Sequence, residues 1–182
     1  MHVGLILAAG SGSRLGTPKA SLVVDGYRLV DRAVNNFASA GITEIYVVLG
    51  AWQGEVQGAH VIVNENWQDG MGSSLRIGLE HISSIESATD ATISLVDLPG
   101  MTPDAIREIV QYPNDIVVGT FSGKPGHPVK FAKKYWSEVS QCAQGDVGAR
   151  NFLKGRDDVH YIPLDELASG KDIDTPEDLL GR

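Results

Sequence analysis

The sequence contains only one cysteine, Cys142, and it has no long apolar run. One cysteine cannot form a disulfide within its own chain, which is typical of proteins in a reducing compartment. No stretch reaches the roughly 18 apolar residues that a membrane-spanning helix needs. The opening residues MHVGLILAAG also lack the basic lead of a secretory signal. We therefore expect a cytoplasmic protein that does not enter a membrane.

The sequence also lacks an excess of basic residues. It has 15 lysines and arginines against 23 acidic residues, which gives a formal net charge of -8. A field of this sign repels nucleic acid, and no basic stripe is present to follow a phosphate backbone. We therefore expect no nucleic-acid partner. A small anionic ligand would need local help from backbone N–H groups, a few cations or a metal ion.

Short β-branched runs alternate with segments of helical periodicity along the whole chain. Strands are expected at residues 2–8, 44–50, 59–65, 91–97, 115–121, 127–131 and 159–164. Helices are expected through residues 30–37, 75–82, 103–110, 132–142, 145–153 and 175–180. Ser73 or Ser74 is expected to cap the second helix, and Thr102 with Pro103 to open the third. The alternation predicts one domain, residues 1–182, folded as a three-layer α/β/α sandwich around a mostly parallel, Rossmann-like sheet.

Three polar segments each follow an expected strand. They are the glycine-rich LAAGSGSRLGTPK at 7–19, VNENWQDGMGSS at 63–74 and DLPGM at 97–101. Ligands of open α/β sheets bind at the carboxyl ends of the strands, close to the point where the strand order reverses. We therefore expect these three segments to lie on one rim of the sheet and to form the binding site.

The glycine-rich segment does not match the Walker pattern, because its lysine comes two residues late and no hydroxyl follows it. The dinucleotide fingerprint fits poorly but stays open, with Asp31 as its acid, because the third glycine is one residue late and Pro18 disfavours a helix there. A third possibility is a loop that wraps a phosphate chain. Its glycines let backbone N–H groups approach oxygens, while Arg14 and Lys19 supply charge. A plain surface turn is the alternative without a function.

Six segments in the same order resemble the molybdenum cofactor cytidylyltransferase group of the MobA-like NTP transferase family. They are LAAGSGSRLGTPK, NENWQDGMGSSLRIGL, DLPGM, GKPGHPVKF, GDVGAR and DIDTPEDL, which span residues 5 to 180 and thus almost the whole chain. The resemblance implies a fold of the nucleotide-diphospho-sugar transferase type. It also implies that a nucleoside monophosphate is transferred from an NTP to the phosphate of molybdopterin, with release of pyrophosphate.

The resemblance assigns roles to residues of the first segment. Gly10, Gly12 and Arg14 would hold the β- and γ-phosphates, and Lys19 the α-phosphate. The remaining residues implied to bind the nucleotide are Leu7, Ala8, Ala9, Asn64, Ser73 and Ser74. The family has Ala at the position of Ala9 where cytosine is chosen and Gly where guanine is chosen. The methyl group of Ala9 therefore favours CTP, and guanylyl transfer is the alternative.

Two carboxylates are implied to bind Mg²⁺ or Mn²⁺, namely Asp97 and Asp174. Together with Arg14 and Lys19, Asp97 would form the catalytic group, since phosphoryl chemistry of this kind needs charge neutralisation and positioning rather than a protein nucleophile. Each aspartate also has a purely structural interpretation. Asp97 suits a turn before Pro99, and Asp174 suits the cap of the last helix.

The resemblance places four further residues beside the incoming molybdopterin-type substrate: Gly70, Met71, His127 and Arg150. Packing by Met71, a hydrogen-bonded structural histidine and a helix salt bridge by Arg150 are the alternative roles. The expected partners are CTP or another NTP, the pterin substrate and, for delivery of the product, a transiently bound molybdoenzyme apoprotein. Two other classes of protein stay open: an NAD(P)H-dependent oxidoreductase related to this group and a non-catalytic carrier of the finished cofactor.

Overall fold

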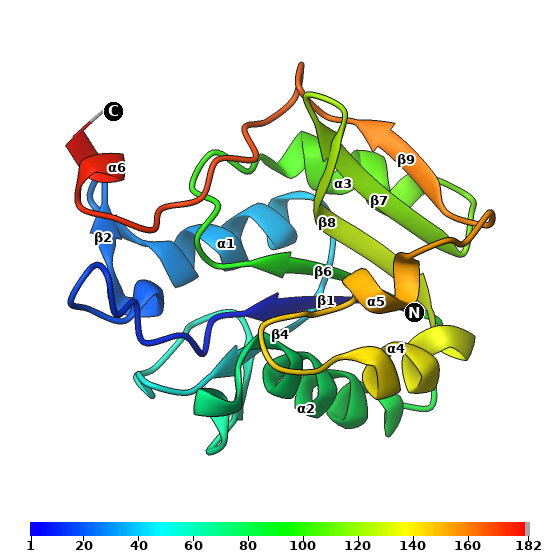
Figure 1. Cartoon of the computed structure of the whole chain (residues 1–182), viewed down its shortest axis with the longest axis horizontal. Coiled ribbons are helices and arrows are strands. Elements are labelled where there is room, and N and C mark those ends of the chain that lie inside the picture. Colours follow the sequence, from blue (N-terminus) through cyan, green and yellow to red (C-terminus); the bar gives the residue numbers. More distant parts are fainter. Residues whose placement is uncertain (181–182) are drawn as a thin grey trace.

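The centre of the molecule is a seven-stranded sheet, seen in a computed structural model that describes residues 1–180 (Figure 1). Residues 181–182, the end of the predicted domain, lie outside the described part. The strands of the sheet are β1 (His2–Leu7), β4 (Glu44–Leu49), β5 (His60–Val63), β6 (Asp90–Leu95), β7 (Ile116–Phe121), β8 (Lys124–Ala132) and β9 (His160–Pro163). Their order in space is β5-β4-β1-β6-β8-β7-β9.

Most neighbouring strands of the sheet run parallel, as predicted. Strand β1 pairs in parallel with β4 and β6, β4 with β5, and β7 with β9. Strand β8 is the exception, since it is antiparallel to both β6 and β7. It begins three residues earlier than predicted because a two-residue turn with positive φ at Ser122 (49°) and Gly123 (72°) joins it to β7 as a hairpin.

Helices cover both faces of the sheet and complete the predicted three layers (Figure 1). Helices α1 (Leu29–Ser39) and α3 (Pro103–Gln111) pack on one face. Helices α2 (Met71–Ser83), α4 (Trp136–Cys142) and α5 (Arg150–Leu153) pack on the other. The last element, α6, spans Glu177–Leu180. Among the helices that the structure describes, none combines the length and the apolar character that crossing a bilayer requires.

The predicted start of α3 is confirmed, whereas α2 does not begin as predicted. The Thr102 hydroxyl accepts the backbone N–H of Ala105 at 3.2 Å, with Pro103 in the first turn of α3. Helix α2 instead begins after Gly70 and has no side-chain cap. Ser73 lies inside the first turn, where its hydroxyl donates to the Gly70 carbonyl at 2.8 Å, so the prediction that Ser73 or Ser74 caps this helix is wrong.

Two local features differ from the sequence expectations. The helix predicted from residue 145 begins only at Arg150, because Gln144 and Val147 pair across a tight turn with Gly145 at φ 51°. A small hairpin, β2 (Val23–Val24) and β3 (Tyr27–Arg28), was not predicted. It follows a short 3-10 helix, Lys19–Ser21, which begins where the glycine-rich loop ends.

Candidate active site

The three polar segments meet at the carboxyl ends of β1 and β6, as predicted, around an open cavity of about 310 Å³. The strand order reverses at β1, since β4 and β5 lie on one side of it and β6 to β9 on the other. Ligands of such sheets usually bind at this point, and the cavity lies beside it. The predicted site residues that line it are Leu7, Ala8, Ala9, Gly10, Lys19, Gly70, Met71, Ser74 and Asp97.

The glycine-rich loop is folded by a turn at Gly12. The Gly12 carbonyl accepts the N–H groups of Leu15 and Gly16 at 2.8 and 2.9 Å, and the φ angle of Gly12 is 60°. A Cβ at this position would lie 2.0 Å from the Thr17 carbonyl oxygen, so only glycine permits the turn. At Gly10 a Cβ would meet no atom within 4 Å. The loop backbone there is therefore open to the cavity.

Lys19 joins the two carboxylates that the sequence singled out. Its Nζ donates to Asp97 Oδ2 at 2.6 Å and to Asp174 Oδ1 at 2.5 Å. Arg14 Nη1 reaches the second oxygen of Asp174 at 3.2 Å, from a side chain that is 72% exposed. Residues more than 150 positions apart in the chain thus form one charged cluster. We name Arg14, Lys19, Asp97 and Asp174 the ion cluster.

The charges of the ion cluster stabilise one another. Burial alone lowers the pKa of Lys19, but the charges and hydrogen bonds of Asp97 and Asp174 outweigh burial and hold that pKa above its ordinary value. The hydrogen bond from Lys19 in turn lowers the pKa of Asp174, helped by the charges of Lys19 and Arg14. At neutral pH the cluster therefore holds a protonated lysine and an ionised Asp174.

Asp97 has one oxygen without a partner. Its Oδ1 is buried and has no hydrogen bond to any described residue. An unpaired buried carboxylate oxygen is costly, and such atoms are commonly completed by a ligand or an ion. Two carboxylates that already converge on one nitrogen form a donor set that suits Mg²⁺ or Mn²⁺, which take a few carboxylate oxygens together with substrate phosphates. The residues present therefore fit a divalent metal, which Asp97 and Asp174 would hold.

Backbone contacts hold the two aspartates side by side. The N–H of Ile173 donates to the Asp97 carbonyl at 3.0 Å, which places Asp174 next to the loop after β6. The Asp178 carboxylate accepts the N–H groups of Asp174 and Thr175 at 3.0 and 2.8 Å, and these bonds lower the pKa of Asp178. Asp178, in the first turn of α6, thus bonds back to the backbone before the helix, and the hydrogen bonds of the Asp174 side chain come from Lys19 and Arg14.

A second polar group, which we name the amide cluster, consists of Asn64, Ser73 and Ser74. The Asn64 Nδ2 donates to the two serine hydroxyls at 2.8 and 3.0 Å, and its Oδ1 accepts the Asn66 N–H at 3.0 Å. All three side chains belong to buried residues. The cluster joins the end of β5 to the first turn of α2, and Ser74 is its member that lines the cavity.

Comparisons with known proteins agree with this geometry. A model of the MobA-like NTP transferase domain matches residues 4–160. The chain belongs to the MobA-like NTP transferase family. Nicotine blue oxidoreductase of Paenarthrobacter nicotinovorans is 31% identical to it, over 97% of this chain and 93% of that protein. Solved nucleotidyltransferases share the fold, which confirms the predicted nucleotide-diphospho-sugar transferase type.

Among solved structures, Rv0371c of Mycobacterium tuberculosis H37Rv superposes with a TM-score of 0.83. It is 27% identical, and the match covers 97% of this chain and 94% of that chain. A structure of Rv0371c in complex with manganese matches with a TM-score of 0.81 at 25% identity and covers 97% and 95%. Molybdopterin-guanine dinucleotide biosynthesis protein A of Archaeoglobus fulgidus shares the fold, with a TM-score of 0.71 and 20% identity over 100% and 96% of the two chains.

The residues predicted for the acceptor side of this MobA-like chain do not form one group. Gly70 and Met71 line the cavity. His127, on β8, is not among the residues that line the cavity, and its Nδ1 lies 3.3 Å from the Ile93 carbonyl oxygen. Burial lowers the pKa of His127, against smaller opposite effects of that carbonyl and of Asp97, so the ring is neutral at pH 7. Arg150 is exposed at the start of α5 and forms no ion pair within residues 1–180.

The cavity wall also includes Ser11, Gln68 and Asp146, which sequence reasoning did not single out. Asp146 belongs to the GDVGAR segment, but the prediction named only the arginine of that motif. The turn that carries Asp146 packs against Gly70, where a Cβ would lie 2.5 Å from the Gly145 carbonyl and 2.7 Å from Asp146 Oδ1. The motif was a usable signal for Asp146. The contact that places its carboxylate in the wall was not visible in the sequence.

Proposed function

We propose that this chain is a divalent-metal-dependent cytidylyltransferase that transfers CMP from CTP to the terminal phosphate of a molybdopterin-type cofactor and releases pyrophosphate. The observation that carries the proposal is the ion cluster, in which Lys19 lies between two carboxylates and Asp97 keeps an unpaired buried oxygen. Membership of the MobA-like NTP transferase family supports nucleotidyl transfer. The relatives described with manganese and as a molybdopterin-guanine dinucleotide protein support the metal and the acceptor.

In this reaction an oxygen of the acceptor phosphate attacks the α-phosphorus of CTP. The new P–O bond forms as the bond between the α-phosphorus and the bridging oxygen of pyrophosphate breaks, and pyrophosphate carries the displaced charge away. The attacking oxygen is already ionised, so the chain need not supply a general base. Mg²⁺ or Mn²⁺ held by Asp97 and Asp174 would supply positive charge that a chain of net charge -8 lacks.

Each residue of the loop then has a separate task. Backbone N–H groups around Gly10 and Gly12, together with the mobile guanidinium of Arg14, hold the β- and γ-phosphates. Lys19 moves its ammonium group from the carboxylates to the α-phosphate, where negative charge increases during the transfer. The reaction therefore depends on positioning and electrostatics supplied by side chains that the sheet brings to one rim.

The direct test is pyrophosphate release by the protein with Mg²⁺, molybdopterin cofactor and either CTP or GTP. We expect release with CTP and little with GTP. No release with either nucleotide would reject the proposed function, and release with GTP alone would reject the choice of base. Omission of the pterin is the control for simple hydrolysis of the nucleotide.

Ala9 offers a test of base choice within the chain. Its backbone is fixed, because its carbonyl accepts the Ala51 N–H at 3.0 Å, and the residue lines the cavity. The substitution Ala9→Gly removes one methyl group from the space proposed for the base. One methyl group in a pocket is worth roughly 1–3 kcal/mol of discrimination. We therefore expect the ratio of kcat/KM for CTP to that for GTP to fall about tenfold or more, as measured with both nucleotides in parallel.

An oxidoreductase is the second candidate, because the curated relative at 31% identity carries that name. The same cavity would then hold a nicotinamide dinucleotide rather than CTP. Thermal unfolding with CTP, GTP, NADH and NADPH in parallel distinguishes the two activities, since a ligand that binds the folded protein raises the melting temperature, and by more the further its concentration exceeds its Kd. We expect CTP with Mg²⁺ to stabilise the protein and the dinucleotides to leave it unchanged.

A further inference from the structure

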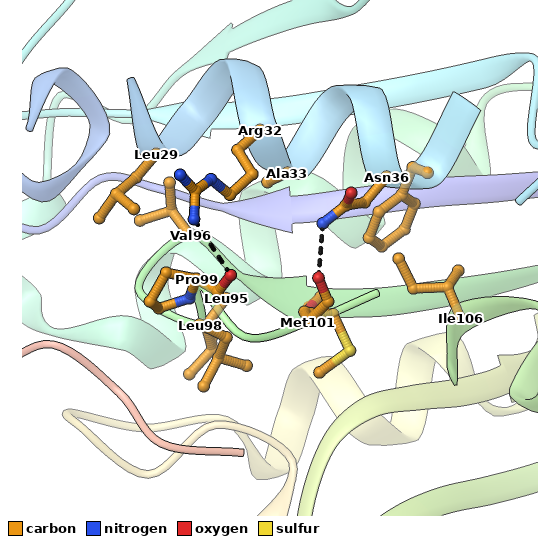
Figure 2. A pocket seen from close by; sticks show the side chains of 12 residues that line it. Leu29, Arg32, Ala33, Asn36, Leu95, Val96, Leu98, Pro99, Met101 and Ile106 are labelled. Carbon is orange, nitrogen blue, oxygen red and sulfur yellow. Dashed lines mark hydrogen bonds between the residues drawn. The ribbon is translucent and has the colours of Figure 1, made fainter. Parts of the chain in front are cut away.

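The loop that carries Asp97 is held from helix α1 by two side chains. Asn36 Nδ2 donates to the Met101 carbonyl at 2.7 Å, and Arg32 Nη1 donates to the Pro99 carbonyl at 3.3 Å. Figure 2 shows both bonds crossing from the helix to the loop. The two residues are four positions apart and so lie on the same face of α1. Neither side chain lines the cavity beside the ion cluster.

Helix α1 and the loop belong to one buried apolar cluster, which includes Leu98 and Met101 of the loop. A cavity of about 10 Å³, room for about one water molecule, interrupts the packing between them. Arg32 and Asn36 form part of its wall, together with Leu98, Pro99 and Met101 (Figure 2). Because the packing is interrupted here, the two hydrogen bonds of Arg32 and Asn36 add to what fixes the loop relative to α1.

Arg32 also holds the segment that follows Lys19. Its Nη2 donates to the Val24 carbonyl at 2.7 Å and lies 3.3 Å from Asp25 Oδ2. One guanidinium group thus connects the hairpin after Lys19 with the loop after Asp97. The side chain is only 21% exposed, which limits competition from water for these bonds. Arg32 therefore links the two chain segments whose side chains meet in the ion cluster.

We propose that Arg32 and Asn36 are positioning residues that fix Asp97 relative to Lys19. Through this position they determine how well Asp97 binds the divalent metal. The inference rests on the proposed function. If either bond to the loop is lost, the Pro99 or Met101 carbonyl loses its partner and the loop loses one of its anchors to α1. Residues that hold a metal ligand in place through such bonds typically change metal affinity or activity by about 10- to 100-fold when they are replaced.

The test uses Asn36→Leu and Arg32→Met in the full chain, with Arg32→Lys as the conservative variant. Asn35→Leu is the matched control, because Asn35 lies one residue earlier on α1, is exposed and makes no hydrogen bond with any described side chain. Binding of Mn²⁺ in the presence of CTP is measured by electron paramagnetic resonance. The steady-state kcat and the KM for CTP are measured below the melting temperature of every variant.

We expect Asn36→Leu and Arg32→Met to weaken Mn²⁺ binding and to lower kcat by about 10- to 100-fold. The KM for CTP should stay unchanged, because neither side chain forms a hydrogen bond to the glycine-rich loop at 7–19. Arg32→Lys, which keeps one donor group and the charge, should recover part of both losses. Asn35→Leu should equal the wild type. Variants that bind Mn²⁺ as the wild type does would overturn the positioning role alone. A wild type that fails to bind Mn²⁺ with CTP would overturn the proposed function, and the positioning role with it.

Discussion

The ion cluster and the amide cluster lie on the same rim of the sheet and differ in how their polar atoms are used. In the ion cluster one lysine serves two carboxylates, Arg14 is largely exposed, and Asp97 keeps an unpaired oxygen. In the amide cluster both N–H groups and the carbonyl oxygen of Asn64 have partners within the chain. The resemblance assigned Arg14, Lys19 and the amide cluster to nucleotide binding, and Asp97 and Asp174 to the metal.

We infer from this difference that the ion cluster supplies the reacting groups, whereas the amide cluster is a rigid support, which we call the frame. A buried polar network whose atoms are all paired makes a segment rigid, and breaking it costs stability. A cluster with a surplus of charge and an unpaired oxygen has unused capacity to bind a ligand. We therefore expect replacement in the ion cluster to affect mainly turnover, and replacement of Asn64 to affect mainly folding.

The largest expected effect is that of Asp97→Asn. The substitution keeps the shape of the side chain but removes the charge that pairs with Lys19 and binds the metal. Loss of one preorganised charged group of this kind costs about 100- to 1000-fold in kcat. Pyrophosphate release should fall by that factor, while circular dichroism and the melting temperature stay close to those of the wild type.

An exposed aspartate provides the control for Asp97→Asn. Asp172 has the same side chain, is exposed and forms no ion pair within the described chain. Asp172→Asn should keep full activity. A folded Asp97→Asn protein with wild-type turnover would contradict the role of Asp97 and remove the functional difference between the two clusters.

Motifs and periodicity predicted the parts of this site that depend on neighbouring residues in the chain. The glycine-rich loop at 7–19, the Thr102–Pro103 helix start and the alternation of strands with helices each have a local signature. The predicted start of α5 was wrong because residues 70–72 hold the turn at 144–147. The bond that holds it runs from the Gly72 N–H to the Gly145 carbonyl at 2.8 Å. The hairpin β2–β3 was missed because its strands have only two residues each.

Contacts between distant segments explain the other gaps. The resemblance named Asp97 and Asp174, but the bond from Ile173 N–H that sets them side by side joins residues 76 positions apart and leaves no local trace. The same holds for Arg32, whose partner Pro99 lies 67 positions away. Sequence motifs thus predicted the candidate reacting groups, whereas the groups that hold them in place were visible only in the structure.

A smaller effect, on folding, is expected for Asn64→Ala. The substitution leaves the Ser73 and Ser74 hydroxyls and the Asn66 N–H without their shared partner. Loss of one partner from a buried polar group costs about 1–3 kcal/mol of the free energy of unfolding. Urea denaturation should show a loss of this size, and the folded variant should keep most of its kcat. The matched control is Asn66→Ala, whose side chain is exposed and forms no hydrogen bond with described residues; equal losses for the two variants would disprove the frame role.

The smallest effect is the dependence of stability on pH that arises from Asp174. Its pKa lies below the ordinary value of 3.8 in the folded chain because Lys19 donates a hydrogen bond to it. A carboxyl with a lowered folded pKa binds its proton more readily in the unfolded state, so its contribution is present above pH 4 and is lost as the pH falls through the folded pKa. The side chain is 39% exposed, so we expect less than about 1 kcal/mol. Urea unfolding of the wild type and of Asp174→Asn between pH 3 and pH 7 should give curves that converge at the acid end; a gap that widens there would show that Lys19 does not stabilise the ionised form of Asp174.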